Sequence, residues 1–164
     1  MKKPTIREMK FLNNGFIKNH SYNSFEAKAK DSLFLLESDE RFDVSCKIHK
    51  TAVNQGFTVS LTPQTFFSIA ISDRVKVTTS IKGCSSTVFF DITQYIDEQS
   101  FVQFKMVRKD NNFSYYLKSK NEYQVVAKAA LNGASDAISF GFFMKDNTFL
   151  KVEDFYYKRV EQTI

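Results

Sequence analysis

Two neighbouring runs of the sequence, 101–108 and 113–118, place polar and aromatic side chains at alternate positions. Side chains two residues apart on a strand point to the same face, so Tyr116 falls on the polar side of its run. A sugar site needs flat aromatic rings that stack on the C–H faces of a pyranose, together with amides and charged groups that bind its hydroxyls. The candidate ligand-binding residues with this chemistry are Gln103, Lys105, Tyr116, Lys118 and Tyr123, with Gln124 beside them. The alternative is that they are ordinary surface residues of an exposed sheet, and Trp, the usual stacking platform, is absent from the sequence.

The sequence contains no recognisable catalytic motif. Glycoside hydrolysis requires two carboxylates roughly 5–9.5 Å apart, which on one strand predicts a spacing such as E-x-D-x-x-E. The nearest acidic clusters are 37–40 with Asp43, which is typical of a solvated turn, and Glu153 with Asp154. A G-x-S-x-G elbow, a phosphate-binding glycine loop and a catalytic Cys–His pattern are all missing. We therefore predict that the protein is not an enzyme, with an enzyme of unrecognised type as the alternative.

The cysteines and histidines show no zinc-binding spacing. Cys46 falls in an alternating apolar run and is predicted to be a small core residue, whereas Cys84, in the turn-like segment 83–86, is predicted to be an exposed thiol. The sequence leaves a disulfide between them open. Oxygen-rich turns can hold calcium, so a structural Ca²⁺ with Asp154 as a side-chain ligand is the one metal site considered. No other cofactor is expected.

Length and composition predict one globular domain. The 164 residues match the roughly 100–200 residues of a typical domain, and we assign 1–164 to a single β-sandwich domain. Hydrophobic residues at 43% and charged residues at 25% exclude disorder. The net charge of +5 is spread without a basic block, so no nucleic-acid partner is expected. Neither a signal peptide nor an apolar run of membrane-span length is seen, so we expect a cytoplasmic protein without a membrane partner.

Strand patterns define the elements that must position these side chains. The clearest is Phe42–Ile48, where apolar and polar residues alternate with a period of two. Further strand runs follow at Phe57–Leu61, Phe66–Ile71, Val75–Ile81, Thr87–Ile92, Phe101–Arg108, Phe113–Lys118, Glu122–Ala129, Ala137–Met144 and Phe149–Val160. Short runs separated by polar turns are the signature of an antiparallel sandwich or barrel.

The first part of the chain has competing interpretations. The pattern at residues 25–29 predicts an early strand. Ala, Lys, Leu and Glu are good helix formers, however, so a short helix over 25–36 is the alternative. Residues 1–20 are an edge strand or a loose arm. The stretch 91–100 has room for one turn of helix.

Several of these runs resemble a known domain. The glycine-led strand Gly56–Leu61, followed by an aromatic hairpin, resembles the concanavalin A-like domain at the C-terminus of β-xylosidase-type glycoside hydrolases. The match continues through Thr65–Ile71, Val75–Val77, Phe101–Arg108, Phe113–Ser119, Ile138–Phe143 and Val152–Tyr156. It covers roughly residues 25–160. The resemblance implies an all-β, two-sheet antiparallel jelly-roll sandwich.

The resemblance also implies a function. In such hydrolases the sandwich is accessory to a propeller-like catalytic domain, for which these 164 residues have no room. Residues 65–67 lack the histidine common in the family, which puts an inherited active-site contact in doubt. We therefore expect a non-catalytic carbohydrate-binding or carbohydrate-associated module whose glycan ligand lies on the concave sheet. The alternatives are a protein-interaction or structural module, including a homo-oligomer, and a closed barrel holding an apolar ligand.

Overall fold

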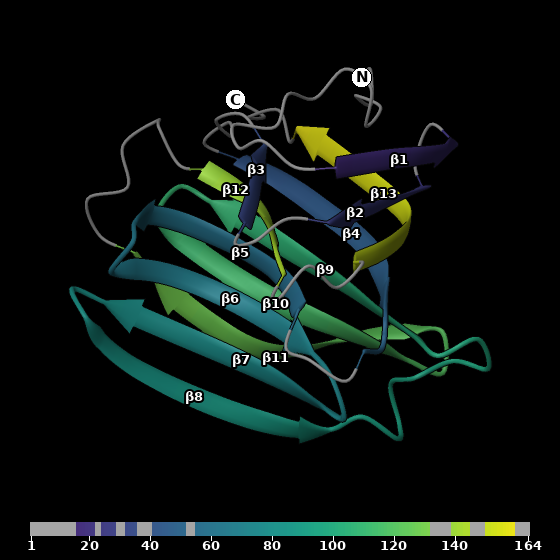
Figure 1. Cartoon of the computed structure of the whole chain (residues 1–164). Helices are drawn as coiled ribbons and strands as arrows, with labels where there is room; N and C mark the ends of the chain where they lie inside the picture. Colours follow the sequence, from purple (N-terminus) through teal and green to yellow (C-terminus); the bar gives the residue numbers. More distant parts are fainter. Residues whose placement is uncertain are drawn as a thin grey trace.

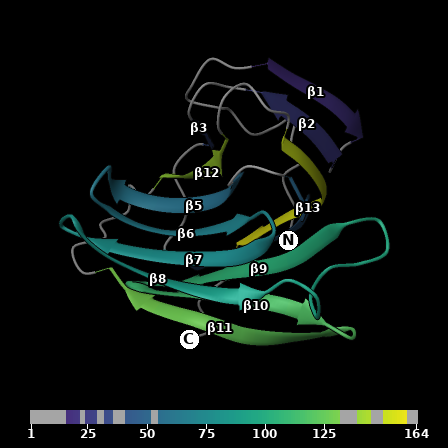
Figure 2. The same ribbon diagram turned by 60° about the horizontal axis from the view of Figure 1, so that its bottom comes forward.

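The computed structural model describes residues 16–21, 24–28, 32–35, 41–51, 55–131, 139–144 and 150–159. These residues form strands and turns and contain no helix, and every pair of neighbouring strands is antiparallel. The strands make two sheets that face each other as two layers (Figure 1; Figure 2). The predicted jelly-roll sandwich is therefore confirmed as the architecture.

The larger sheet has seven strands. In spatial order they are β1 (Phe16–Ser21), β2 (Ser24–Lys28), β13 (Leu150–Arg159), β4 (Arg41–His49), β9 (Phe101–Lys109), β10 (Asn112–Ser119) and β11 (Glu122–Ala130). The last strand of the chain thus lies between β2 and β4, and β1 and β11 are the edges.

The smaller sheet has six strands. In spatial order they are β3 (Ser32–Leu35), β12 (Ser139–Phe143), β5 (Gln55–Thr62), β6 (Thr65–Ile71), β7 (Arg74–Ile81) and β8 (Cys84–Asp91). The hairpins from β5 to β8 follow chain order, while β12 joins them from the C-terminal part.

Phenylalanine rings fill the space between the sheets. Phe57 of the smaller sheet lies 5.7 Å from Phe104 of the larger one, measured between ring centroids. Phe67 and Tyr115 meet across the same gap at 4.4 Å. Burial of large apolar surface between two sheets is the main stabilising contribution to such a fold. The alternative of a closed barrel is wrong, because the phenylalanines pack as a core between two sheets that both have open edges.

Three of the hairpins turn through two-residue loops that contain residues with positive φ. Lys82 and Gly83 both have positive φ between β7 and β8, and Lys120 and Asn121 do between β10 and β11. Positive φ at both loop positions is the requirement of a type I′ turn, which matches the twist of the flanking strands. Asp110 has positive φ in the third loop, between β9 and β10.

The alternative of a helix over residues 25–36 is wrong. Residues 24–28 and 32–35 are strands in different sheets. Phe25 is buried between the sheets and meets Phe142 edge-on at 5.3 Å. This packing outweighs the weak helix preference of the neighbouring Ala and Lys.

Other early expectations have mixed outcomes. Residues 16–21 form an edge strand, and residues 1–15 lie outside the described part of the chain. The stretch 91–100 contains two turns: in the first, the backbone N–H groups of Tyr95 and Ile96 both donate to the carbonyl of Ile92 at 2.9 Å, and in the second, that of Ser100 donates to the carbonyl of Asp97 at 3.1 Å. Within the described ranges, no helix has the length and apolar character needed to span a membrane.

Candidate functional site

The outward face of β9, β10 and β11 carries the predicted ligand-binding residues. Burial alternates along β9 and β10, so that Phe104 and Tyr115 point into the core. Their neighbours Lys105 and Tyr116 therefore point outward, and they are direct partners in the β9–β10 register. Backbone pairing of this kind places outward side chains about 5 Å apart at their Cβ atoms.

The five predicted residues meet in one cluster, which we call the tyrosine–lysine cluster (Gln103, Lys105, Tyr116, Lys118 and Tyr123). The Nζ atom of Lys105 lies 4.8 Å from the ring centroid of Tyr116 and 4.7 Å from that of Tyr123. The Nζ atom of Lys118 lies 5.6 Å from the Tyr123 ring, and Gln103 Nε2 donates a hydrogen bond to the Tyr123 hydroxyl at 3.1 Å. These contacts hold the two rings by cation–π attraction and one hydrogen bond.

Tyr123 reaches the cluster because β11 contains a bulge. The register changes from Tyr115 opposite Ala127 to Tyr116 opposite Val125. Beyond this point Tyr123 pairs with Lys118, on the outward face. Gln124 pairs instead with Leu117, whose side chain is buried, so the structure does not bring Gln124 to the cluster.

The environment of Tyr123 is partly shielded from solvent. Burial raises the pKa of its phenol, and the hydrogen bond from Gln103 offsets this only in part. Tyr123 therefore remains a neutral hydroxyl at physiological pH, able both to donate and to accept hydrogen bonds.

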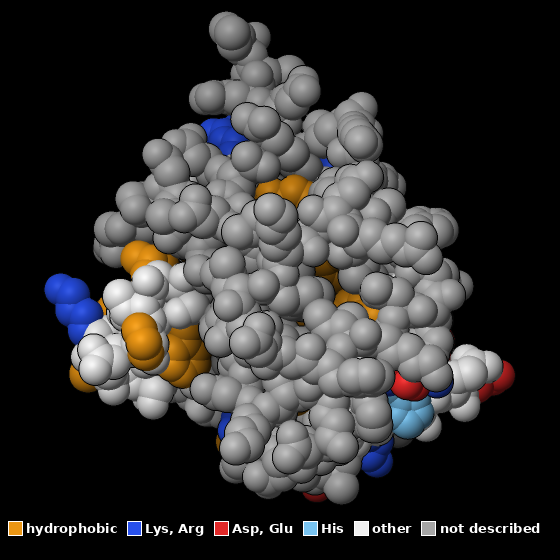
Figure 3. Space-filling model, turned by 45° about the horizontal axis from the view of Figure 1, so that its top comes forward, with side chains coloured by type: hydrophobic (Ala, Val, Ile, Leu, Met, Phe, Trp, Pro, Cys, Tyr) orange, Lys and Arg blue, Asp and Glu red, His pale blue; other side chains and the backbone are white. Residues whose placement is uncertain are grey.

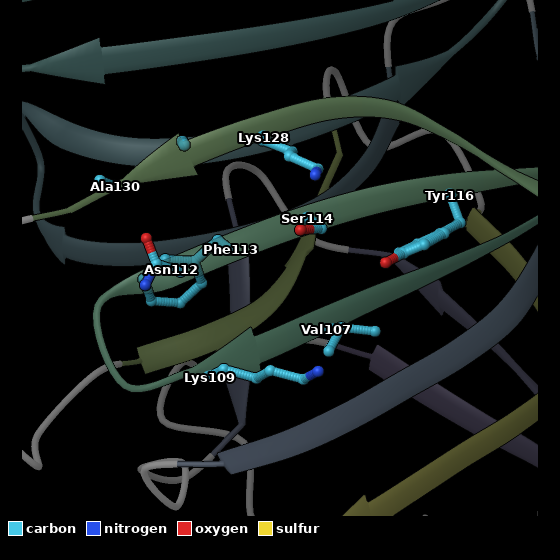
Figure 4. Close-up of a pocket in the computed structure, with 9 residues that line it drawn as sticks. Val107, Lys109, Asn112, Phe113, Ser114, Tyr116, Lys128 and Ala130 are labelled. Atoms are coloured by element: carbon cyan, nitrogen blue, oxygen red, sulfur yellow. The ribbon is translucent and has the colours of Figure 1, made fainter.

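A hollow of about 480 Å³ lies beside the cluster, and Tyr116 belongs to both. It lies over the end of the sheet where β9 turns into β10. Its lining residues are Val107, Lys109, Asn112, Phe113, Ser114, Tyr116, Lys128, Ala129 and Ala130. Figure 4 shows Lys109 and Lys128 on either side of Ser114, with the Tyr116 hydroxyl pointing toward Ser114.

Sequence reasoning missed Lys109, Asn112, Ser114 and Lys128. The alternation that put Tyr116 on the polar side also puts Ser114 there, so this residue could have been found. Lys128 could not, because in a regular strand it and Tyr123 would point to opposite faces. The bulge places both of them outward, with Lys128 opposite Ser114.

Asp154 lies at a bulge of β13 and has positive φ. Its carboxylate oxygen lies 3.5 Å from Lys47 Nζ, and that of Glu153 lies 3.9 Å from the same atom. In the part of the chain that the structure describes, no three His, Cys, Asp or Glu side chains gather in a way that could hold a metal ion. The calcium site at Asp154 stays a prediction, and what the structure places beside Asp154 is a lysine.

Both cysteines are free thiols in the predicted environments. Cys46 is buried on β4, and Cys84 is exposed at the start of β8. Burial raises the pKa of the Cys46 thiol well above its usual value, and the negative charge of Asp154 raises it further. The disulfide left open by the sequence does not form between these two positions.

Comparisons with known proteins identify the fold. A functionally unknown protein from Saccharomyces cerevisiae matches with a TM-score of 0.74 and 11% identity, over 96% of this chain and 100% of that one. A xylan β-1,4-xylosidase from Bacillus halodurans C-125 matches with a TM-score of 0.68 and 10% identity, over 83% of this chain but only 33% of the xylosidase chain. The carbohydrate binding module CBM66 from Bacillus subtilis matches with a TM-score of 0.59 and 14% identity, over 92% of this chain and 94% of the module.

These structures share the sandwich architecture, as the resemblance seen in the sequence implied. No protein-family model matches the sequence, and no curated protein is significantly similar to it. Because identities of 10–14% show the fold alone, the chemistry of the outward face must be argued from its own residues.

Proposed function

We propose that this protein is a non-catalytic carbohydrate-binding module whose glycan lies on the outward face of β9, β10 and β11. The observation that carries the proposal is that the tyrosine–lysine cluster gathers from three strands beside a hollow that Tyr116 also lines. The volume of about 480 Å³ lies within the roughly 300–1,000 Å³ usual for small-ligand sites.

The side chains of this face suit a sugar. Tyr116 and Tyr123 offer aromatic surface for the C–H face of a pyranose ring. Gln103, Ser114 and Asn112 offer amide and hydroxyl groups for its hydroxyls. The lining of the hollow includes no carboxylate, whereas glycoside hydrolysis uses two, so we propose binding without hydrolysis.

The comparisons support the same class of function. One neighbour of similar length is named a carbohydrate binding module, and another is part of a xylosidase. This chain spans about one third of that xylosidase, and we transfer neither its substrate nor its activity.

The test is calorimetric titration of the full chain with a panel of oligosaccharides, repeated with Tyr116→Ala. We expect measurable binding of at least one oligosaccharide and a loss of affinity of about tenfold in the variant, because the stacking surface is removed. Phe89→Ala is the control: it removes a more exposed aromatic ring from β8, in the other sheet.

Two results would contradict the proposal. One is the absence of binding to every oligosaccharide in the panel. The other is binding that Tyr116→Ala and Phe89→Ala weaken equally, since the glycan would then lie elsewhere on the surface.

A second candidate function is self-association through β8. This strand is an edge of the smaller sheet, and its residues from Cys84 to Phe90 carry no charge. Val88 and Phe89 are about half exposed. Figure 3 shows hydrophobic side chains at the surface on the left, the side on which the β5–β6 and β7–β8 hairpins both lie in Figure 1. Edge strands are usually protected from pairing by charged side chains, so an uncharged one favours pairing with a second copy.

Sedimentation analysis of Val88→Lys tests this candidate. If β8 pairs with β8 of a second copy, the wild type sediments as a dimer and the variant as a monomer. Val125→Lys, at an equally exposed position on the edge strand β11, should leave the dimer intact. A monomeric wild type would exclude the candidate.

A further inference from the structure

Two lysines face the hollow from opposite sides. Lys109 comes from the end of β9 and Lys128 from β11, and the two strands flank β10. Strands two places apart in a sheet are separated by roughly 10 Å, and a lysine side chain can reach about half of that. Figure 4 shows both side chains extending over the sheet on either side of Ser114.

The charges of these two lysines are not neutralised by the described part of the chain. Neither has an ion pair with a carboxylate there, whereas Arg41 pairs with Asp110 at 3.3 Å and Lys47 lies near two carboxylates. The carboxylate next in the register is that of Asp43, opposite Val107 on β4. It lies three places along the sheet from Lys128, beyond β9 and β10, and Lys158 is paired beside it on β13.

The neighbouring cluster adds positive charge to the same face. Lys105 and Lys118 contact aromatic rings rather than carboxylates. Cation–π contact leaves the charge of an ammonium group in place, so four lysines contribute to a positive field over this face. The chain as a whole carries a net charge of +5, which adds to the attraction of an anion.

We propose that the glycan bound on this face is acidic, and that the hollow receives an oxyanion carried on a sugar ring. The oxyanion lies between Lys109 and Lys128 above the Ser114 hydroxyl, and Tyr116 lies against the ring. The carboxylate of a uronic acid and a sulfate ester share this chemistry. This inference rests on the proposed carbohydrate binding and specifies the class of its ligand.

The test compares pairs of ligands with the same sugar rings, one with and one without the negative charge. Oligogalacturonates and their methyl esters have the same rings, but the esters lack the negative charge. A sulfated galactan oligosaccharide with its desulfated form provides the second arm. We expect one acidic form to bind the full chain about five- to twentyfold more tightly than its neutral form at low salt, and this preference to shrink as salt is added.

The double variant Lys109→Gln and Lys128→Gln assigns the preference to the hollow. It should bring the affinities of the acidic and neutral forms to within about twofold of each other. Lys82→Gln, an exposed lysine in the β7–β8 loop of the other sheet, should leave the preference unchanged. A thermal melt checks that all variants remain folded.

The outcomes separate this inference from the proposed function. Equal binding of acidic and neutral sugars, lost in Tyr116→Ala, would overturn the acidic class and leave carbohydrate binding standing. A preference that the double variant retains would place the oxyanion elsewhere and overturn the inference. Absence of binding to every sugar would overturn both. Preference for the oligogalacturonate over its methyl ester would identify the oxyanion as a carboxylate, and preference for the sulfated over the desulfated galactan would identify it as a sulfate ester.

Discussion

At the scale of single residues, two adjacent tyrosines of β10 have opposite environments. Tyr115 is buried, and its hydroxyl donates to the carbonyl oxygen of Phe67 on the other sheet at 2.7 Å. Tyr116 points outward onto the ammonium group of Lys105. The two tyrosines are adjacent in the sequence, and successive side chains of a strand point to opposite faces of the sheet. One therefore lies in the core and the other at the surface.

The hydrogen bond of Tyr115 leads to a stability prediction. Tyr115→Phe removes the donor and leaves the Phe67 carbonyl without this partner in a buried site, so we expect a loss of about 1–3 kcal/mol in the free energy of unfolding. Tyr116→Phe should change it by less than about 0.5 kcal/mol, since its hydroxyl lies at the surface. Urea unfolding of both variants measures the difference, and equal losses would disprove the assignment.

The two thiols lead to a prediction of reactivity. Cys84 is exposed, whereas Cys46 is buried and its thiol pKa is raised, so little of it is thiolate at neutral pH. We expect a thiol reagent at pH 7.5 to label one cysteine per folded chain and both in denaturant. Mass spectrometry of peptides identifies the site, and labelling of Cys46 in the folded protein at the rate of Cys84 would contradict the structure.

At the scale of elements, the bulge of β11 is the feature on which the candidate site depends. It brings Tyr123 and Lys128, five residues apart, to the same face of one strand. The hairpin loops at 110–111 and 120–121 keep β9, β10 and β11 in register on both sides of the bulge. Together these local features turn three amphipathic strands into one continuous surface.

A glycine sets the spacing between two strands of the smaller sheet. A Cβ atom added at Gly56 would overlap the backbone carbonyl of Ile69 on β6. We expect Gly56→Ala to destabilise the protein by about 3 kcal/mol or more, because backbone rather than a flexible side chain must move.

Gly83→Ala provides the comparison for Gly56. A Cβ atom at Gly83 meets nothing within 4 Å, but its positive φ strains any other residue. Its cost should be about 1 kcal/mol. Thermal or urea unfolding measures both variants, and a smaller loss at Gly56 than at Gly83 would show that β5 and β6 are not so close.

At the scale of the whole molecule, the core between the sheets contains ionisable groups that must stay neutral. Burial raises the pKa of Cys46 and of Tyr115 well above their ordinary values of 9.0 and 10.0. Both groups are fully buried between the two layers, so the fold itself keeps them protonated.

These two groups predict how the stability of the protein falls at alkaline pH. Each group has a higher pKa in the folded than in the unfolded state. Its contribution to the free energy of unfolding is therefore complete at a pH below the pKa of the unfolded state, and it is lost as the pH rises toward the pKa of the folded state. Above about pH 9 for the thiol and 10 for the phenol, the unfolded chain releases protons that the folded chain retains, which lowers stability by about 1.4 kcal/mol per pH unit for each group. Urea unfolding at pH 8, 9.5 and 10.5 should show this decline, and a shallower one in Cys46→Ala. Parallel curves for the two proteins would contradict it.

The alternation of residues along the chain was enough to predict most of the strands and the two faces of β9 and β10. A period of two is a local property, so Phe104 and Tyr115 were assignable to the core and Gln103, Lys105 and Tyr116 to the surface without a structure. Some turn residues were equally local, because Gly83, Asp110 and Asn121 are of the types that tolerate the positive φ they adopt.

The arrangement of these strands depends on long-range contacts that appear only in the folded protein. The bulge of β11, the position of β13 between β2 and β4 and the choice of strand over helix at 24–28 depend on contacts between residues far apart in the chain. Such contacts leave no periodic trace in the sequence, because the partner of a strand is selected by the packing of the whole core. For this reason the tyrosines and lysines of the cluster could be named in advance, while Lys128, Gln124 and the hollow were placed only by the fold.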